Sequence, residues 1–169
     1  YKAYFGNGAT NATPQGFTLQ GTSGSGTNIT GAGLTIASGQ GTGTGTSGNI
    51  TFQYAPAGAS GSSLNALQTA CTISGTNGSL SCPGAGSSSE RFGAGATAGG
   101  SQSVALGNGA SAGGNISTAI GYLAVANTYG STVLGYGANA PGTNSVALGV
   151  NATGNTDAAV AVGFGAISG

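Results

Sequence analysis

Six glycines recur every fourteen residues in the second half of this 169-residue chain. They are Gly93, Gly107, Gly121, Gly135, Gly149 and Gly163. Each glycine follows an apolar residue, and an alanine stands three positions after it. A serine stands four positions before each of the first five glycines, and Ala159 takes that place before the last one. A fixed period without slippage over this length predicts stacked, near-identical structural units.

The composition favours order and excludes several kinds of partner. Glycine contributes 37 residues, and the charged residues are Lys2, Glu90, Arg91 and Asp157. Disordered chains usually combine low hydrophobicity with high net charge, whereas this chain has zero net charge and is 38% hydrophobic. Two cations cannot neutralise a phosphate backbone or form the basic face of a membrane-surface helix. The chain also has no apolar run of about 18 residues. We therefore expect no nucleic-acid partner and no membrane insertion by this segment.

The repeat unit reads as two short strands joined by turns. Residues three and one before the glycine share a strand face because side chains alternate. They are large or β-branched, as in Val104 and Leu106, while the residue between them is mostly small, as in Ala105. Alanines alternate downstream, as in Ala110 and Ala112. We expect two strands of about five residues per coil, with the glycine supplying φ > 0 at a corner. The large side chains of one strand would fill a thin interior against the alanines of the other, and the remaining apolar surface would pack against further copies of the chain.

This unit resembles the repeat of YadA-like heads in trimeric autotransporter adhesins, S-V-A-I-G-x-x-A-x-A. Residues 103–107 (S-V-A-L-G) and 145–149 (S-V-A-L-G) match it closely. The resemblance implies a left-handed parallel β-roll that forms a homotrimer on the cell surface. The first unit departs from the pattern, with Glu90-Arg91-Phe92 where V-A-L would stand, and we interpret it as a transition into the roll. The last unit ends six residues after its glycine, so we expect the array to continue in a longer protein.

Residues 1–88 lack this period and form a second region, rich in glycine and threonine. Short β-prone runs between turn residues predict strands at 17–20, 34–37, 49–54, 71–74 and 80–82. The string LTIASGQGTGTGTSGNITFQYAPAG is similar to segments of phage tail-fibre proteins, in which the β-roll repeat also occurs. The predicted fold is therefore all-β, with a glycine-rich β region at 1–88 followed by the β-roll at 89–169.

The two cysteines, Cys71 and Cys82, flank a hairpin signal at Asn77-Gly78. They would face each other near the open end of that hairpin. We expect a disulfide there, which favours an oxidising, extracellular environment. Two buried thiols or a bond between chains are the alternatives. A zinc site would need more ligands, and the chain has no histidine.

Catalytic chemistry has few candidate residues, so we expect no catalytic residue, no cofactor and no metal. Glycoside hydrolysis usually needs two carboxylates flanking the bond. Glu90 and Asp157 would lie nearly five coils apart, about 23 Å at the usual strand spacing. We expect Glu90 and Arg91 to form a local or intersubunit ion pair instead. The run G-T-G-T-S-G at residues 43–48 matches G-x-G-x-x-G, but a strand pattern follows it where a dinucleotide site needs a helix. We interpret it as a turn.

Three aromatic residues directly follow repeat glycines: Tyr122, Tyr136 and Phe164. Tyr122 and Tyr136 belong to successive coils and should stack as a ladder at one corner. Aromatic rings with polar tips suit contacts with sugars or proteins, which makes these three residues candidate receptor contacts. The alternative is aromatic packing that stiffens the corner or seals an interface between chains.

Taken together, the sequence predicts a segment of an extracellular, trimeric fibre that attaches a particle or a cell to a host surface. A phage tail fibre or another virion appendage is the first hypothesis, and the head of a bacterial trimeric adhesin is the alternative. A lateral or helical polymer would bury the same faces as a homotrimer. The chain begins with Tyr1 rather than Met, which favours a processed or excised piece. Its opening aromatic residues, Tyr1, Tyr4 and Phe5, are expected to anchor it to other fibre domains or to a neighbouring subunit, or to dock as an edge strand.

Overall fold

The computed structural model describes residues 16–61 and 63–169. The chain divides into two compact units, Tyr1–Ala37 and Ser38–Gly169. Every regular element in the described residues is a β-strand, which confirms the all-β prediction. The second unit contains a small antiparallel sheet and the whole repeat array. The boundary between residues 88 and 89 stays a prediction.

In the first unit, the described residues 16–37 contain no strand, so the strands predicted at 17–20 and 34–37 are wrong. A backbone hydrogen bond from Ala32 N to Thr22 O, 2.8 Å long, joins two parts of this segment. The apolar side chains of the two expected strands, such as Leu19 and Ile36, are exposed. An isolated ribbon without a layer to pack against is marginal in water, which explains why the alternating pattern alone does not produce strands here.

A three-stranded antiparallel sheet opens the second unit, in the order β1-β2-β3. Its strands are β1 (Ile50–Tyr54), β2 (Gln68–Ile73) and β3 (Leu80–Ser81). The predictions at 49–54 and 80–82 match closely, whereas β2 begins three residues before the predicted 71. The register shifts between Phe52 and Gln53, where the pairing with β1 skips Ala70 of β2.

The connection between β2 and β3 is the predicted hairpin. Gly78 adopts φ 69°, and its amide donates to the carbonyl oxygen of Ser74 at 2.8 Å. Thr72 pairs with Ser81, so Cys71 and Cys82 stand at the next opposed position. They form a disulfide within the chain. The expected disulfide is confirmed as a bond within the chain rather than two buried thiols.

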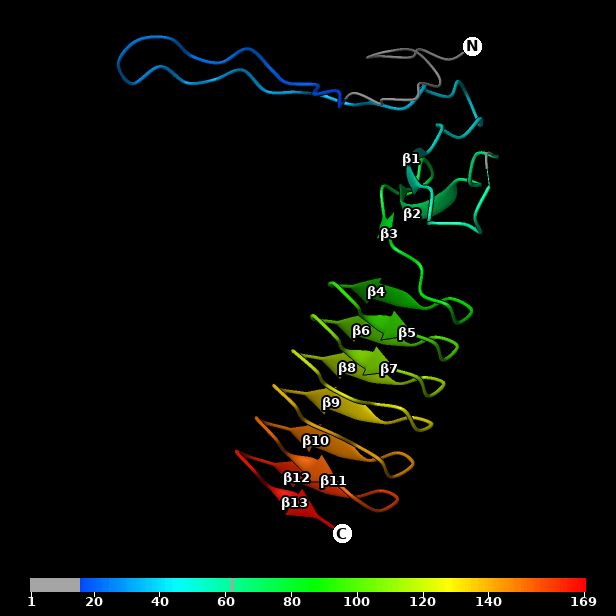
Figure 1. The fold of residues 1–169 in the computed structure, drawn as a ribbon, viewed down its shortest axis with the longest axis vertical. Helices are drawn as coiled ribbons and strands as arrows, with labels where there is room; N and C mark the ends of the chain where they lie inside the picture. Colours follow the sequence, from blue (N-terminus) through cyan, green and yellow to red (C-terminus); the bar gives the residue numbers. More distant parts are fainter. Residues whose placement is uncertain (1–15, 62) are drawn as a thin grey trace. The chain divides into compact units, whose positions relative to one another are not determined.

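The repeat array folds as a parallel β-solenoid of stacked coils (Figure 1). Each coil gives one strand to a six-stranded sheet, and neighbouring strands pair residue i with residue i+14. The strands are β4 (Glu90–Phe92), β6 (Val104–Leu106), β8 (Thr118–Ile120), β9 (Thr132–Leu134), β10 (Val146–Leu148) and β12 (Val160–Val162). They are shorter than the predicted five residues because the corners use the flanking positions.

A second row of shorter strands closes the other side of each coil. It comprises β5 (Thr97–Ala98), β7 (Ser111–Ala112), β11 (Thr153–Gly154) and β13 (Ile167–Ser168). Single parallel bridges at Val125 and Asn139 continue the row through the middle coils. The array therefore has two parallel rows of strands with an interior between them.

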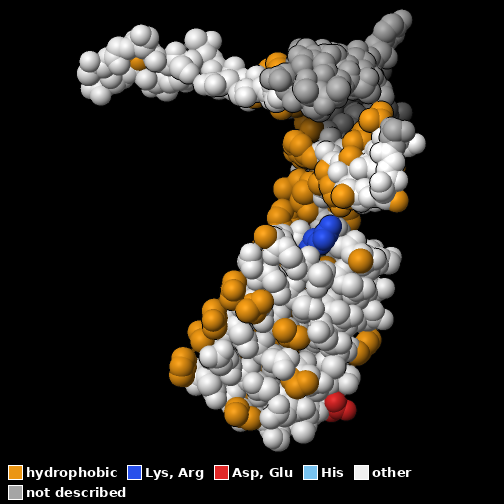
Figure 2. Space-filling view, in the orientation of Figure 1, with side chains coloured by type: hydrophobic (Ala, Val, Ile, Leu, Met, Phe, Trp, Pro, Cys, Tyr) orange, Lys and Arg blue, Asp and Glu red, His pale blue; other side chains and the backbone are white. Residues whose placement is uncertain are grey.

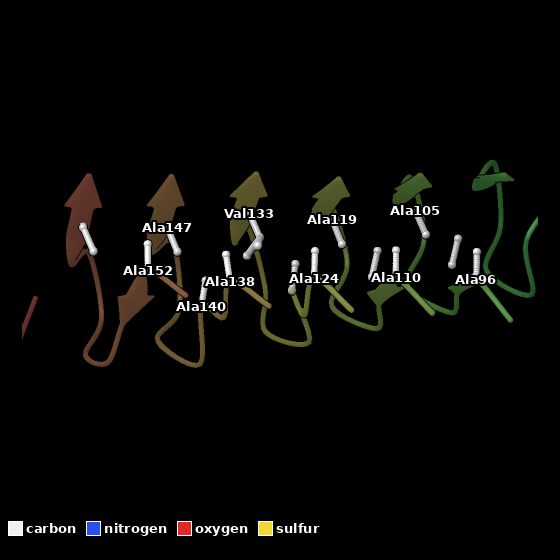
Figure 3. Packing of buried hydrophobic residues seen from close by; sticks show 14 residues of the cluster. Ala96, Ala105, Ala110, Ala119, Ala124, Val133, Ala138, Ala140, Ala147 and Ala152 are labelled. Atoms are coloured by element: carbon white, nitrogen blue, oxygen red, sulfur yellow. The ribbon is translucent and has the colours of Figure 1, made fainter. Parts of the chain in front are cut away.

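The interior is built almost entirely of alanine, and Figure 3 shows these side chains lying between the two rows. The six-stranded sheet contributes Ala105, Ala119, Val133, Ala147 and Ala161, and the second row contributes the alternating alanines that begin at Ala96 and Ala98. The expectation that the large residues fill the interior is wrong. Leu106 and Leu134 point outward and are 46% and 50% exposed. A coil this thin has room only for small side chains on both rows, so the large residues must occupy the outer face.

The corners need left-handed backbone conformations, as predicted for the repeat glycines. Gly107 and Gly121 have φ values of 136° and 133°. A Cβ on Gly121 would also lie 2.4 Å from the carbonyl oxygen of Gly135 in the next coil. Glycine is therefore fixed at this corner both by its backbone angle and by the close approach of the next coil.

Candidate functional site

The predicted tyrosine ladder is present at the corner that follows the six-stranded sheet. The ring centroids of Tyr122 and Tyr136 lie 5.4 Å apart with an interplanar angle of 14°. The two side chains are 48% and 55% exposed. They come together because each follows a corner glycine and the coils repeat in register. The stacked pair is thus fixed by the roll itself.

Phe164 does not join this pair. Val150 occupies the same place in the coil between Tyr136 and Phe164, so the aromatic row is interrupted. Phe164 is 85% exposed. The structure therefore brings together two of the three candidate receptor residues and leaves the third on its own.

The stacking limits how the tyrosine pair can contact a ligand. Each ring covers one face of the other, so a ligand reaches the ring edges, the hydroxyl groups and the two outer faces. The tyrosine hydroxyls can both donate and accept hydrogen bonds. Asn108, one coil before Tyr122 in the same row, adds an exposed amide. The arrangement provides polar groups beside apolar edges, at intervals set by the coil spacing.

Leu123 widens the apolar part of this corner and was missed by sequence reasoning. It is 49% exposed and adopts φ 55°, a region in which a bulky residue is uncommon. Its Cδ2 atom lies over Gly109 of the preceding coil, 2.7 Å from where a Cβ of that glycine would stand. Superposing the repeats in the sequence would have pointed to Leu123, because glycine stands at the equivalent position of the neighbouring coils, as Gly109 and Gly137.

The opposite corner carries a second pair of exposed apolar side chains, Ile116 and Tyr129. Ile116 adopts φ 58° although it is β-branched, and both side chains are about half exposed. Gly130 and Asn144 stand at the position of Ile116 in the next two coils. This corner was not predicted from the sequence either. Superposing the repeats would have shown an apolar residue, Ile116, where later coils have glycine or asparagine.

The two acidic residues of the array bind backbone and hydroxyl groups. The Glu90 carboxylate accepts from the Ser81 hydroxyl and the Cys82 amide, and Asp157 Oδ1 accepts from the Thr143 amide at 2.8 Å. The expected local ion pair between Glu90 and Arg91 is wrong: neighbouring strand residues point to opposite faces, and the Arg91 side chain bonds to Pro83 O instead. An ion pair between subunits stays a prediction.

The glycine-rich run at residues 43–48 contains a turn at residues 43–44, as interpreted. Gly45 N donates to Thr42 O at 2.9 Å, and Gly48 N donates to Gly39 O at 2.9 Å. The element that follows is the strand β1, and no helix begins there. The loop therefore lacks the helix N-terminus that holds the pyrophosphate in a dinucleotide site.

Within residues 16–61 and 63–169, no cluster of His, Cys, Asp and Glu could hold a metal ion. No helix long and apolar enough to cross a membrane occurs in the same residues. The absence of catalysis and of cofactors stays a prediction. The opening residues Tyr1, Tyr4 and Phe5, with Lys2, lie outside the described residues.

Comparison with known proteins identifies the roll. The family model described as YadA head domain repeat (2 copies) matches residues 92–110, 112–138 and 140–166. A search of curated proteins found no match. The matched residues run from the last residue of β4 to the residue before β13, and they include the tyrosine pair. The roll of this chain is therefore built of YadA-like β-roll head repeats.

Proposed function

We propose that this chain is a structural and adhesive segment of an extracellular, homotrimeric fibre that attaches a particle or a cell to a host surface. The observation that carries this proposal is the apolar outer face of the six-stranded sheet. One residue per coil forms its main row: Phe92, Leu106, Ile120, Leu134, Leu148 and Val162. Apolar side chains are also spread over the visible face of the roll in Figure 2. A contiguous exposed apolar surface of this kind marks an interaction site.

We propose that two further copies of the chain pack against this face. YadA head domains form trimers, and the buried residues of a single roll are alanines, serines, glycines and one valine. Such a core removes little apolar surface from water, since burial contributes about 25 cal/mol per Å². Association of three rolls would add the large side chains to a shared core.

The proposed location is extracellular. The Cys71–Cys82 disulfide supports it, because such bonds persist in oxidising environments. We further propose that the segment has no enzymatic activity, since its described carboxylates Glu90 and Asp157 are held in structural hydrogen bonds. Its work would be mechanical and adhesive.

Two kinds of fibre fit this function. A phage tail fibre or virion appendage is supported by the glycine- and threonine-rich string at residues 34–58. The head of a bacterial trimeric autotransporter adhesin is supported by the family match of the roll. The full-length gene separates them: tail genes beside it support the first, and a C-terminal outer-membrane anchor supports the second.

The mass of the full chain in solution tests the trimer. We expect three times the chain mass by light scattering, persisting until the sample is boiled in detergent. Changing Leu106 and Leu134 together to Glu should give monomers, because it places charges in the proposed interface. Asn155→Glu, a charge at an exposed position outside this sheet, is the matched control and should leave the trimer intact. A monomeric wild-type chain would overturn the proposal.

The tyrosine pair is the proposed receptor contact, with a neutral glycan or protein surface as ligand. Only Glu90, Arg91 and Asp157 carry side-chain charges in the described chain, so the corner has no complement for a strongly charged ligand. Tyr122→Ala with Tyr136→Ala should abolish host-cell or glycan binding, whereas the exposed Tyr129→Ala at the other corner should not. The double Phe variant separates the hydroxyl groups from the rings. Unchanged binding by the double Ala variant would end this proposal.

A further inference from the structure

The strand β4 is one edge of the six-stranded sheet, and its outer backbone groups are covered by the chain itself. Pro83 forms an antiparallel bridge with Glu90. Arg91 N donates to Cys82 O at 3.0 Å, and Gly84 N donates to Ser89 O at 2.9 Å. An uncovered edge of this kind is a template for another strand. Residues 82–84 therefore occupy the position where a further strand would add.

The Glu90 side chain holds this covering segment in place. Its Oε1 accepts from the Ser81 hydroxyl at 2.7 Å, and its Oε2 accepts from the Cys82 amide at 2.7 Å. Hydrogen bonds to an ionised acceptor are roughly twice as strong as neutral ones. The carboxylate thus joins the first strand of the roll to the end of β3.

Arg91 also bonds to the covering segment at this end of the roll. It stands in the inward row that Ala105 and Ala119 continue in the following coils. Its Nε donates to the carbonyl oxygen of Pro83 at 3.2 Å. Arg91 is exposed, so this bond adds a second side-chain contact between β4 and the covering segment.

The disulfide anchors the covering segment from the other side. Cys82 follows β3 directly and is covalently joined to Cys71 in β2. The segment is therefore fixed on one side by a covalent bond to the antiparallel sheet. On the other side, the Glu90 carboxylate fixes it to the roll.

We infer that residues 71–91 form a disulfide-locked cap that closes the β4 edge against addition of an extended strand from another copy of the chain. Glu90 is the positioning residue of this cap. Solenoid proteins need terminal caps for solubility, and this one is assembled from elements outside the repeat pattern. The inference depends on contacts within one chain, so it does not require the proposed trimer.

Hydrogen exchange on the full chain tests the cap. In Glu90→Gln, we expect the amides of Cys82, Gly84 and Arg91 to exchange on the order of tenfold faster, because a charge-assisted bond is lost. The Thr132 amide, bonded to Ser145 O in the middle of the roll, should keep its rate. Asp157→Asn is the matched control, since its carboxylate also accepts a backbone amide but lies away from the cap.

Reduction provides an independent test, because the chain has two cysteines and both are in this bond. A phosphine reductant, or Cys71→Ser with Cys82→Ser, should accelerate the same three amides and cause the mass to grow with protein concentration. If Glu90→Gln also accelerates exchange of the Thr132 amide, the variant has unfolded. The reduction experiment then tests the cap without it. Unchanged exchange at the three cap amides after reduction, or equal acceleration by Asp157→Asn, would overturn the inference.

Discussion

The hydroxyl of Ser117 donates a 2.6 Å hydrogen bond to the carbonyl oxygen of Gly114, three residues earlier in the chain. Ser117 is completely buried. The same bond joins Ser89 to Gly86, Ser103 to Gly100, Ser131 to Thr128 and Ser145 to Gly142. Each bond ties a turn to the start of the next strand. The repeated serine is thus a structural residue that satisfies a polar group inside an alanine core.

Replacing this serine should weaken the roll without blocking it. Ser117→Ala should lower the free energy of unfolding by about 1 kcal/mol, the usual contribution of one hydrogen bond. Ala159 already occupies this position in the last coil, so alanine fits there. Chemical unfolding at fixed protein concentration measures the change. Ser101→Ala, at a corner position, serves as control, and equal stability of the two variants would contradict the structural role of Ser117.

Adding a single methyl group at the corner should be far more damaging. Gly121→Ala is expected to cost about 2 kcal/mol or more, because φ is 133° there and the new Cβ would press on Gly135 O. Gly99→Ala is the matched control: a Cβ there would be 4.0 Å from its nearest neighbour atom. Thermal unfolding of both variants should show a loss for Gly121→Ala alone. A comparable loss for Gly99→Ala would mean that the corner conformation is not the cause.

Val133 is the one large side chain within the alanine interior, and its removal should be measurable. Val133→Ala deletes two methyl groups from a completely buried site, so we expect a loss of about 2 kcal/mol including the cavity. Val150→Ala removes the same atoms at a corner where the side chain is 39% exposed. It should cost clearly less. Denaturant midpoints compare the two, and a larger effect at Val150 would contradict the assignment of the interior.

Relief of backbone strain should stabilise the coil that contains Ile116. Its φ of 58° suits Asn or Gly, and Asn144 holds the equivalent place two coils later with φ 55°. We expect Ile116→Asn to raise stability by about 1 kcal/mol. Ile120→Asn, at an ordinary strand position, should lower it. A loss of stability or of assembly in Ile116→Asn would instead show that this side chain makes favourable contacts with another chain.

The sequence was sufficient for the features that repeat. The regular glycines predicted the corners and their positive φ, and the spacing of Tyr122 and Tyr136 predicted their stacking. The hairpin turn at Asn77-Gly78 likewise predicted the disulfide between its flanking cysteines. In each case the information is local or is copied from coil to coil.

The orientation of the strands could not be derived from apolar periodicity alone. Both faces of β6 are apolar, with Val104 and Leu106 on one and Ala105 on the other, so alternation does not say which one is buried. The distance between the two rows of strands decides which face is buried, because the space between them has room for alanine but not for leucine. The hydrogen bond between Glu90 and Ser81 could not be predicted from the sequence either. Ser81 lies in the antiparallel sheet and Glu90 in the roll, and no sequence repeat links these two regions.

The in-register pairing of each coil with the next has a consequence for how this protein can change. Each coil pairs with the coil before it and the coil after it. Removing residues 113–126 would therefore connect residue 112 to residue 127, which is equivalent to residue 113, and the coils on either side would pair as before. The product would be shorter by about 4.8 Å, one strand spacing. Gain or loss of whole repeats in the gene can therefore change the length of the roll in fixed steps, without changes in the residues at either end of the roll.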